Sequence, residues 1–202
     1  MIVAHNEAYK IIKKNCPDSS VGFAKNNSYF EGGTLANGVK KYWNHYFLYK
    51  TKFDYIGLNY YFHDRIVASI TPPFFKTKNE NKKVSDMNWE IYPEEIFEVL
   101  MDLKKYKKPI IITENGLADA EDKLRGQFIV NHLKCIHRAI QNGVDVKGYV
   151  YWSLLDNFEW AYGFKPRFGL IEIDYKTQKR TIRKSALTYA IMVKKHQLGK
   201  KY

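Results

Sequence analysis

Residues 109–116, Pro-Ile-Ile-Ile-Thr-Glu-Asn-Gly, place a carboxylate directly after an apolar run. Three consecutive isoleucines that follow a proline are typical of a short strand buried on both faces, as in a parallel sheet. The Asn-Gly pair predicts a turn immediately afterwards. Barrel enzymes keep catalytic groups at this end of their strands, so Glu114 is a candidate catalytic carboxylate. A residue that merely begins a solvated turn would give the same local pattern, and this stretch leaves both interpretations open.

Residues 148–160 carry a second set of groups that could act at one end of a sheet. The buried strand predicted there ends near Trp152, and Glu159 and Trp160 follow shortly after it. Sugar sites combine these groups, because aromatic faces stack on the apolar C–H face of the ring while a carboxylate accepts hydrogen bonds from paired hydroxyls. Taken singly, each residue is also explained by a core tryptophan and a surface Glu-Trp pair.

The elements that would position these groups alternate along the chain. Apolar runs predict buried strands at 21–24, 53–61, 109–116 and 146–155, and a hairpin arm at 167–174. Helical spacing predicts helices at 2–14, 34–50, 93–105, 121–142 and 185–196. The first helix is expected to bury one face, and the aromatic residues of 34–50 are expected to form a core face. Residues 62–90 show no clear period and are predicted to form a long loop.

This alternation predicts an α/β fold made of parallel βα units. Four such units do not close a barrel, whereas eight do. The 202 residues are sufficient for a sizeable core and predict a single domain over 1–202. Aromatic residues make up 16% of the chain, which indicates thick packing or a surface that stacks on flat apolar faces such as sugar rings.

The net charge of +12 invites a nucleic-acid interpretation. The lysines are scattered as pairs, however, and the one denser group, within 104–108, lies where a helix is predicted to end and suits the helix dipole. A solvated lysine-rich surface explains the charge better, so no nucleic-acid partner is expected.

Cysteine and histidine give no sign of a metal centre. Cys16 and Cys135 are too few and too far apart for a disulfide framework or a metal site. His5, His45 and His63 have no carboxylate or second histidine at ligand spacing and are expected to be packing or surface residues. The chain begins without a signal-peptide pattern and contains no apolar run long enough to span a membrane. We therefore expect a cytoplasmic location, no membrane partner and no cofactor.

Several longer motifs strongly resemble glycoside hydrolase family 1, the β-glucosidase family. The main ones are Gly-Leu-Asn-Tyr-Tyr at 57–61, Thr-Glu-Asn-Gly at 113–116 and Trp-Ser-Leu-Leu-Asp-Asn-Phe-Glu-Trp at 152–160. Shorter matches at 89–93, 167–169 and 183–186 follow the same order. Several motifs in register are far more specific than any one of them.

The resemblance implies a (β/α)8 TIM barrel, of which this chain would hold about the last four βα units, and a retaining β-glycosidase mechanism. By that resemblance Glu114 is the nucleophile that attacks the anomeric carbon. Tyr61 resembles the residue whose hydroxyl hydrogen-bonds this carboxylate, which would keep it ionised and correctly aimed. Asn59 resembles a polar neighbour at the same strand end.

The same resemblance assigns the sugar contacts. Trp152 matches the platform beneath the reacting sugar, and Glu159 and Trp160 match the pair that binds its outer hydroxyls. Phe168 matches an aromatic wall near them, and Trp89 matches a tryptophan on the leaving-group side. A carboxylate at Glu159 would repel a sugar phosphate, so a neutral β-glycoside is the expected substrate.

The acid/base half of the family's site is not visible in this sequence. The family's Asn-Glu-Pro motif is absent, and Asn6-Glu7-Ala8 lacks the proline and lies on a predicted helix. The sequence thus predicts the C-terminal half of a retaining β-glycosidase, either as a truncated fragment or as a half completed by another polypeptide. The partner would be an N-terminal barrel half, or a second copy that associates through open sheet edges. A non-catalytic sugar-binding or interaction module derived from the family is the alternative.

Overall fold

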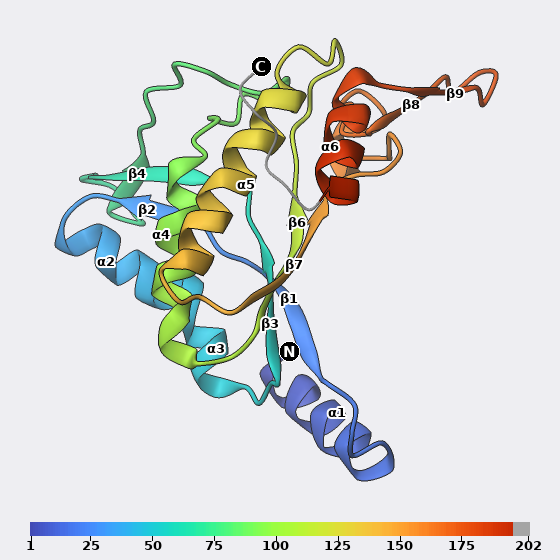
Figure 1. Ribbon diagram of the computed structural model, residues 1–202. Helices are drawn as coiled ribbons and strands as arrows, with labels where there is room; N and C mark the ends of the chain where they lie inside the picture. Colours follow the sequence, from blue (N-terminus) through green and yellow to red (C-terminus); the bar gives the residue numbers. More distant parts are fainter. Residues whose placement is uncertain (196–202) are drawn as a thin grey trace.

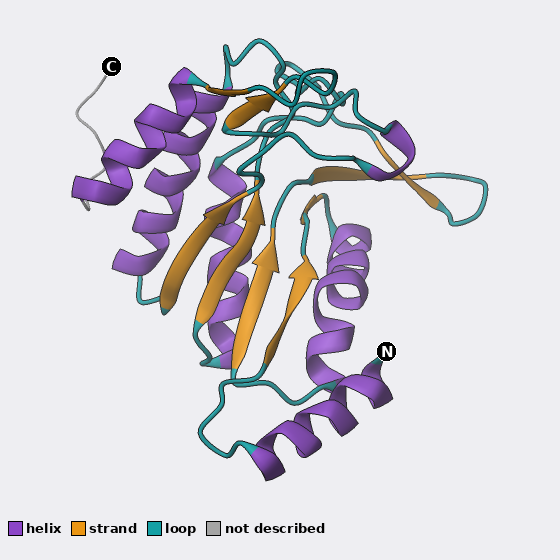
Figure 2. Cartoon of the chain, turned by 90° about the vertical axis from the view of Figure 1, so that its right-hand side faces the viewer, coloured by secondary structure: helices purple, strands orange, loops and turns teal. Residues whose placement is uncertain are grey.

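The computed structural model describes residues 1–195 and is organised around a sheet of four parallel strands (Figure 1). Their order in the sheet is the order along the chain: β1 (Gly22–Asn26), β3 (Tyr55–Asn59), β6 (Ile110–Asn115) and β7 (Val146–Tyr151). Figure 2 shows that the four arrows point to one end of the molecule, where the long loops gather. The predicted parallel βα arrangement is therefore confirmed.

The helices match the predicted segments. They are α1 (Ile2–Asn15), α2 (Thr34–Lys40), the π-helical turn η1 (Lys41–His45), α3 (Tyr46–Lys50), α4 (Glu94–Leu103), α5 (Arg125–Gln141) and α6 (Lys184–Lys195). Two short 3₁₀ turns complete the set, η2 (Lys104–Tyr106) and η3 (Trp160–Tyr162). Residue 196 of the last predicted helix lies outside the described residues.

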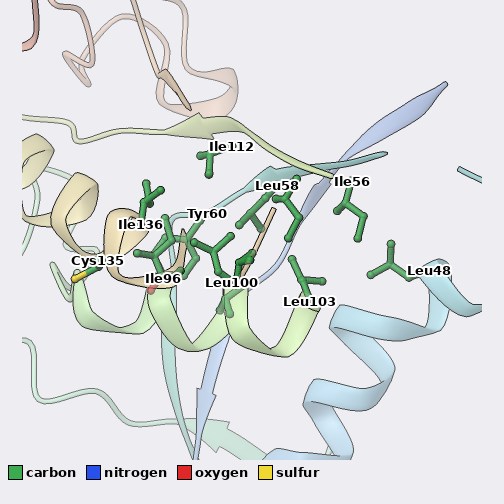
Figure 3. Packing of buried hydrophobic residues seen from close by; sticks show 14 residues of the cluster. Leu48, Ile56, Leu58, Tyr60, Ile96, Leu100, Leu103, Ile112, Cys135 and Ile136 are labelled. Atoms are coloured by element: carbon green, nitrogen blue, oxygen red, sulfur yellow. The ribbon is translucent and has the colours of Figure 1, made fainter. Parts of the chain in front are cut away.

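The main core lies between the sheet and helices α4 and α5 (Figure 3). Helix α4 follows Pro93 and carries the exposed carboxylate of Glu94 in its first turn, where a negative charge interacts favourably with the helix dipole. Its apolar side places Ile96, Leu100 and Leu103 against Leu58 and Ile112 of the strands. Each of these side chains is fully buried and contributes roughly 1.5–3 kcal/mol relative to an exposed position.

Residues 62–90 are not one long loop, and this prediction was wrong. They contain β4 (His63–Ala68) and β5 (Phe75–Thr77), which form an antiparallel pair around the Pro72–Pro73 turn. Strand β2 (Tyr29–Glu31) pairs with β4 in parallel and completes a second sheet. The local sequence does not show the pairing of β4 with β2, because these two strands lie far apart along the chain. The predicted hairpin arm is confirmed as β8 (Ile171–Ile173) paired with β9 (Arg180–Ile182).

Two predicted buried faces are instead exposed. Helix α1 forms as predicted but buries none of its residues, and Val3 is 75% exposed. Beside β1, Tyr42 and Trp43 are 70% and 53% exposed and, together with Phe23 and residues of α1, they line a groove of roughly 840 Å³. The reason is common to both. β1 is an edge strand of the described sheet, so the apolar faces beside it have nothing to pack against.

Glu95 in the first turn of α4 makes the stability of this fold depend on pH. The side chain is buried, and burial together with the charges of Glu31 and Glu90 raises its pKa to about 9. A carboxyl whose pKa rises on folding favours the folded state below its unfolded pKa, near 4.5, and this advantage is lost as pH rises toward about 9. We expect the free energy of unfolding to fall between pH 5 and pH 9.

Urea titrations at pH 5 and pH 8.5 test this dependence. The variant Glu95→Gln should lose most of the fall, because the neutral amide does not ionise. The matched control is Glu94→Gln, an exposed neighbour, which should keep the pH dependence of the wild type. An unchanged pH dependence in Glu95→Gln would assign the effect to another group.

None of the helices within residues 1–195 is both long and apolar enough to cross a bilayer.

Candidate active site

The carboxyl ends of β3, β6 and β7 bring the predicted catalytic residues together. Asn59 at the end of β3 pairs in register with Glu114 of β6, and Asn115 pairs with Tyr151 at the end of β7. The backbone N–H of Tyr60 donates to the carbonyl of Glu114 at 2.9 Å. The ladder thus continues to the point where each strand meets its loop, and fixes the strand ends relative to one another.

Glu114 and Tyr61 are joined directly. The Tyr61 hydroxyl donates a hydrogen bond of 2.9 Å to Oε2 of Glu114. Burial, followed by the negative charges of Glu114 and Glu159, raises the pKa of Tyr61 well above its usual range. The phenol therefore remains a hydrogen-bond donor to Glu114 at physiological pH.

Asn59 is oriented by the neighbouring strand. Its amide oxygen accepts a hydrogen bond of 2.6 Å from the Thr113 hydroxyl. With the oxygen occupied, the amide nitrogen is the group available to donate to a ligand beside Glu114.

Asn115 is a site-building residue that sequence reasoning missed. The Asn-Gly pair predicted a turn, but Asn115 is the last residue of β6 and is fully buried, so this prediction was wrong. Its amide donates to the Tyr60 carbonyl at 2.8 Å and accepts from the Tyr149 hydroxyl at 3.0 Å. The backbone N–H of Trp152 donates to its carbonyl. One side chain thus connects three strands immediately beside Glu114, and only the fold reveals these partners.

Gly116 is required by the close approach of two strand ends. A Cβ atom built at this position would lie 1.8 Å from the backbone oxygen of Trp152. The backbone cannot absorb such a clash locally, so we expect Gly116→Ala to lower the free energy of unfolding by about 3 kcal/mol. Urea denaturation measures the loss. The control is Gly126→Ala in α5, where a Cβ meets nothing within 4 Å and the change should be neutral or stabilising.

Glu159 faces the same site from the loop that follows β7. Its Oε2 accepts a hydrogen bond of 2.9 Å from the Asn157 amide, and its backbone N–H donates to Gly163 at 2.7 Å. The charge of Glu159 also contributes to the raised pKa of Tyr61. Trp160 is 83% exposed, so its ring is free of protein packing.

Trp89 joins the site through an aromatic cluster. Its ring lies 5.8 Å from that of Tyr61, 4.7 Å from that of Phe62 and 5.9 Å from that of Phe168. Phe168 is only 1% exposed and therefore lies behind Trp89 as packing rather than as an open wall. Half-buried Trp152 begins the loop that carries Glu159.

A buried carboxylate, Asp156, anchors that loop and was not singled out from the sequence. Asp156 accepts hydrogen bonds from the guanidinium of Arg183 at 2.9 Å, from that of Arg167 at 3.2 Å and from the backbone N–H of Gly169 at 2.9 Å. Burial alone would raise its pKa, but Arg183 and the backbone N–H groups of Gly169 and Ile173 outweigh it and hold the pKa below its usual value. The signal was present, because both arginines belong to the shorter matching motifs.

The histidines were expected to be packing or surface residues, and two of them have acidic partners. His45 contacts Asp102 at 2.6 Å, and His63 contacts Glu90 at 2.8 Å. These partners are distant in sequence, so local spacing could not show them. Within residues 1–195, no group of three or more His, Cys, Asp or Glu side chains is arranged to hold a metal ion.

Comparison with known proteins identifies the fold. The model of glycosyl hydrolase family 1 matches residues 42–198. A β-galactosidase of Pyrococcus woesei is 36% identical over 67% of this chain. A 1,4-β-D-glucan glucohydrolase of Thermotoga neapolitana is 31% identical over 98% of this chain. The family 1 β-glucosidase of Thermotoga maritima superposes with a TM-score of 0.90 at 29% identity and covers 98% of this chain.

The chain spans only part of these relatives: 30% of the Pyrococcus protein, and 56% of both Thermotoga proteins. Its four βα units reproduce about half of the structure to which they are similar, and the described sheet is open. The predicted partial barrel is thereby confirmed. The chain belongs to glycosyl hydrolase family 1.

Proposed function

We propose that this chain supplies the nucleophile half of a retaining β-glycosidase site. The observation that carries the proposal is the 2.9 Å hydrogen bond from the Tyr61 hydroxyl to Glu114, at the carboxyl ends of parallel strands. Among the family's members similar to this chain are β-glucosidases and β-galactosidases. An oriented carboxylate beside a permanently protonated phenol is the group that such chemistry needs as a nucleophile.

The proposed reaction has two steps. Glu114 uses one carboxylate oxygen to attack the anomeric carbon, while the glycosidic bond breaks and the leaving oxygen takes a proton from an acid about 5–5.5 Å away. Water then attacks the anomeric carbon of the resulting glycosyl ester and gives its proton to the same group, which now acts as the base, while the bond to Glu114 breaks and the carboxylate is released. Tyr61 holds Oε2 throughout, so that the other oxygen of Glu114 is aimed at the sugar.

The sugar would be bound by groups on the surrounding loops. Trp152 would stack beneath the ring, while Glu159 and Trp160 hydrogen-bond its outer hydroxyls and Asn59 donates to a hydroxyl near Glu114. Trp89, backed by Phe168, would line the leaving-group side. The negative charge of Glu159 favours a neutral β-glycoside over a phosphorylated sugar.

The general acid must come from another polypeptide segment. The sequence contains no Asn-Glu-Pro motif, and Glu7 lies exposed on α1, where it pairs with Lys10 at 2.7 Å. General acid catalysis is worth about 10²–10⁴ in rate, so the half site alone would turn over poorly. A complementary N-terminal barrel half would supply this group together with the remaining sugar contacts.

The open edges of the sheet indicate the form of that partner. Strands β1 and β7 each have one side without a described neighbour, and apolar side chains line the groove beside β1. If two copies of this chain closed one barrel, β7 of one copy would lie beside β1 of the other. Helix α6 of the first copy and helix α1 of the second would then both have to pack outside this junction. A partner half whose last element is a strand avoids this conflict, because α1 of this chain can cover that strand.

Mixing tests the proposal. The chain would be combined with an N-terminal half of the Thermotoga maritima β-glucosidase and assayed on an aryl β-glucoside. We expect activity in the mixture and little in either part. The control is the same N-terminal half with its Asn-Glu-Pro glutamate changed to glutamine, which should associate but stay inactive. Association of the unmodified halves without activity would contradict the proposal.

The missing acid also fits a second function, a sugar-binding module without catalysis. Titration of the isolated chain with glucose or cellobiose, followed by tryptophan fluorescence, separates the two. Saturable binding by the chain alone, together with an inactive mixture, favours the binding module. A cytoplasmic location remains a prediction from the sequence.

A further inference from the structure

A buried histidine joins three segments that are far apart in the sequence. His63, the first residue of β4, is 4% exposed. Its Nδ1 lies 2.8 Å from Oε2 of Glu90 in the loop before α4, and its Nε2 lies 3.1 Å from Oε2 of Glu31 at the end of β2. The ring is therefore held at both nitrogens by carboxyl groups from two different elements.

Each of the two contacts needs a proton, either on the ring nitrogen or on its carboxyl partner. A neutral imidazole donates from one nitrogen only, and ionised carboxylates only accept, so the two contacts together require one further proton in the group. Glu95 adds a third carboxyl with Oε1 3.7 Å from Nε2 of His63, and its buried Oε2 has no partner among the described residues. Burial and the charges of Glu31 and Glu90 raise the pKa of Glu95 to about 9, so it stays protonated and adds no negative charge.

His63 and its partner Glu90 each lie close in sequence to a residue of the proposed site. Glu90 directly follows Trp89, and His63 is separated from Tyr61 only by Phe62, on which Trp89 packs with ring centroids 4.7 Å apart. The bond between His63 and Glu90 therefore ties the segment that bears Tyr61 to the segment that bears Trp89.

The loop that bears Trp89 is held by the same Glu90 side chain that contacts His63. Between β5 and α4 the chain makes a tight turn, with Asn88 in the left-handed region at φ 58° and the N–H of Ser85 donating to the carbonyl of Trp89. The second carboxylate oxygen of Glu90 accepts from the N–H of Asn81 at 3.0 Å. One side chain thus holds the turn internally and connects it to β4.

We propose that His63 is a positioning residue that acts through Glu90 to fix Trp89, and with it Tyr61, against the sugar site. The consequence for catalysis rests on the proposed function. The effect on the position of Trp89 is independent of the proposed function, and it can be measured in the isolated chain without any sugar.

The experiment uses the full chain labelled with 5-fluorotryptophan and read by fluorine NMR. The chain has four tryptophans, and the variant Trp89→Phe assigns the resonance of interest. We expect His63→Gln and Glu90→Gln each to shift or broaden the Trp89 resonance, with the resonance of exposed Trp43 unchanged. The double variant should add little to either single change, because both remove the same link.

The matched control is His132→Gln. His132 is also buried, but its Nδ1 contacts the backbone carbonyl of Phe128 and no carboxyl group. It should leave the Trp89 resonance in place, and circular dichroism should show folded chains throughout. An unmoved Trp89 resonance in folded His63→Gln, an equal change in His132→Gln, or additive changes in the double variant would each overturn the proposal. If His63→Gln does not fold, the more conservative variant Glu90→Gln decides.

Discussion

Replacing Glu114 by glycine is expected to abolish hydrolysis of an aryl β-glucoside by the reconstituted barrel, by on the order of 10⁶-fold. The change removes the only proposed group that can attack the anomeric carbon, while Tyr61 and the other strand-end residues remain. The release of the aryl alcohol measures the loss. In the covalent mechanism, no substitution of another proposed site residue should lower the rate as much.

Azide makes this prediction specific for a nucleophile. A small anion can enter the space left by the carboxylate and attack the same carbon, so Glu114→Gly with azide should yield a glycosyl azide of inverted configuration. The control is Tyr61→Phe, which keeps the carboxylate and loses one hydrogen bond to a charged group, worth about 1.5–3 kcal/mol or roughly 10- to 100-fold. Azide should not raise the activity of Tyr61→Phe. An active Glu114→Gly variant, or one without an azide product, would contradict the assignment.

The position of Glu114 could be predicted from the sequence because its causes are local. Ile110 and Ile112 are fully buried on one face of β6, Ile111 on the other face is half-buried, and the carboxylate follows at the strand end. Parallel strands place their carboxyl ends along one edge, so Asn59 and Glu114 had to be neighbours once both strands were recognised. No long-range information beyond strand order was needed.

The residues that the sequence did not reveal take their roles from distant partners. Asn115 reads locally as a turn residue, but Tyr60 and Tyr149 hold it inside the sheet. The parallel pairing of β4 with β2 is not visible locally, because β2 precedes β4 by a long stretch of chain. The contacts of His63 with Glu31 and Glu90 are hidden for the same reason.

The exposure of the aromatic residues beside β1 shows a different limit. Helical spacing indicates which residues of 34–50 share a face, and Tyr42 and Tyr46 do lie together, with ring centroids 5.5 Å apart. It does not indicate whether anything covers that face. In the described chain the face borders an open sheet edge and stays exposed, so a correct period led to a wrong prediction of burial.

Asp156→Ala is expected to lower the free energy of unfolding by about 3–5 kcal/mol. The change leaves Arg183, which is buried with the carboxylate, as an uncompensated charge, and it removes the acceptor of the Gly169 N–H. Urea denaturation at neutral pH measures the loss. Asp145→Ala is the control, because its exposed ion pair with Lys147 should leave the urea midpoint close to that of the wild type.

The pH dependence of the same variant separates the ion pair from simple packing. The pKa of Asp156 is lowered on folding, so its contribution is present above the unfolded pKa, near 3.8, and is lost as pH falls through the folded value. As the pH falls below about 4, the free energy of unfolding should therefore decrease more for the wild type than for Asp156→Ala, and the two values should converge in acid. Equal differences at pH 7 and pH 3 would mean that the shape of Asp156, and not its charge, holds the loop of Glu159 in place.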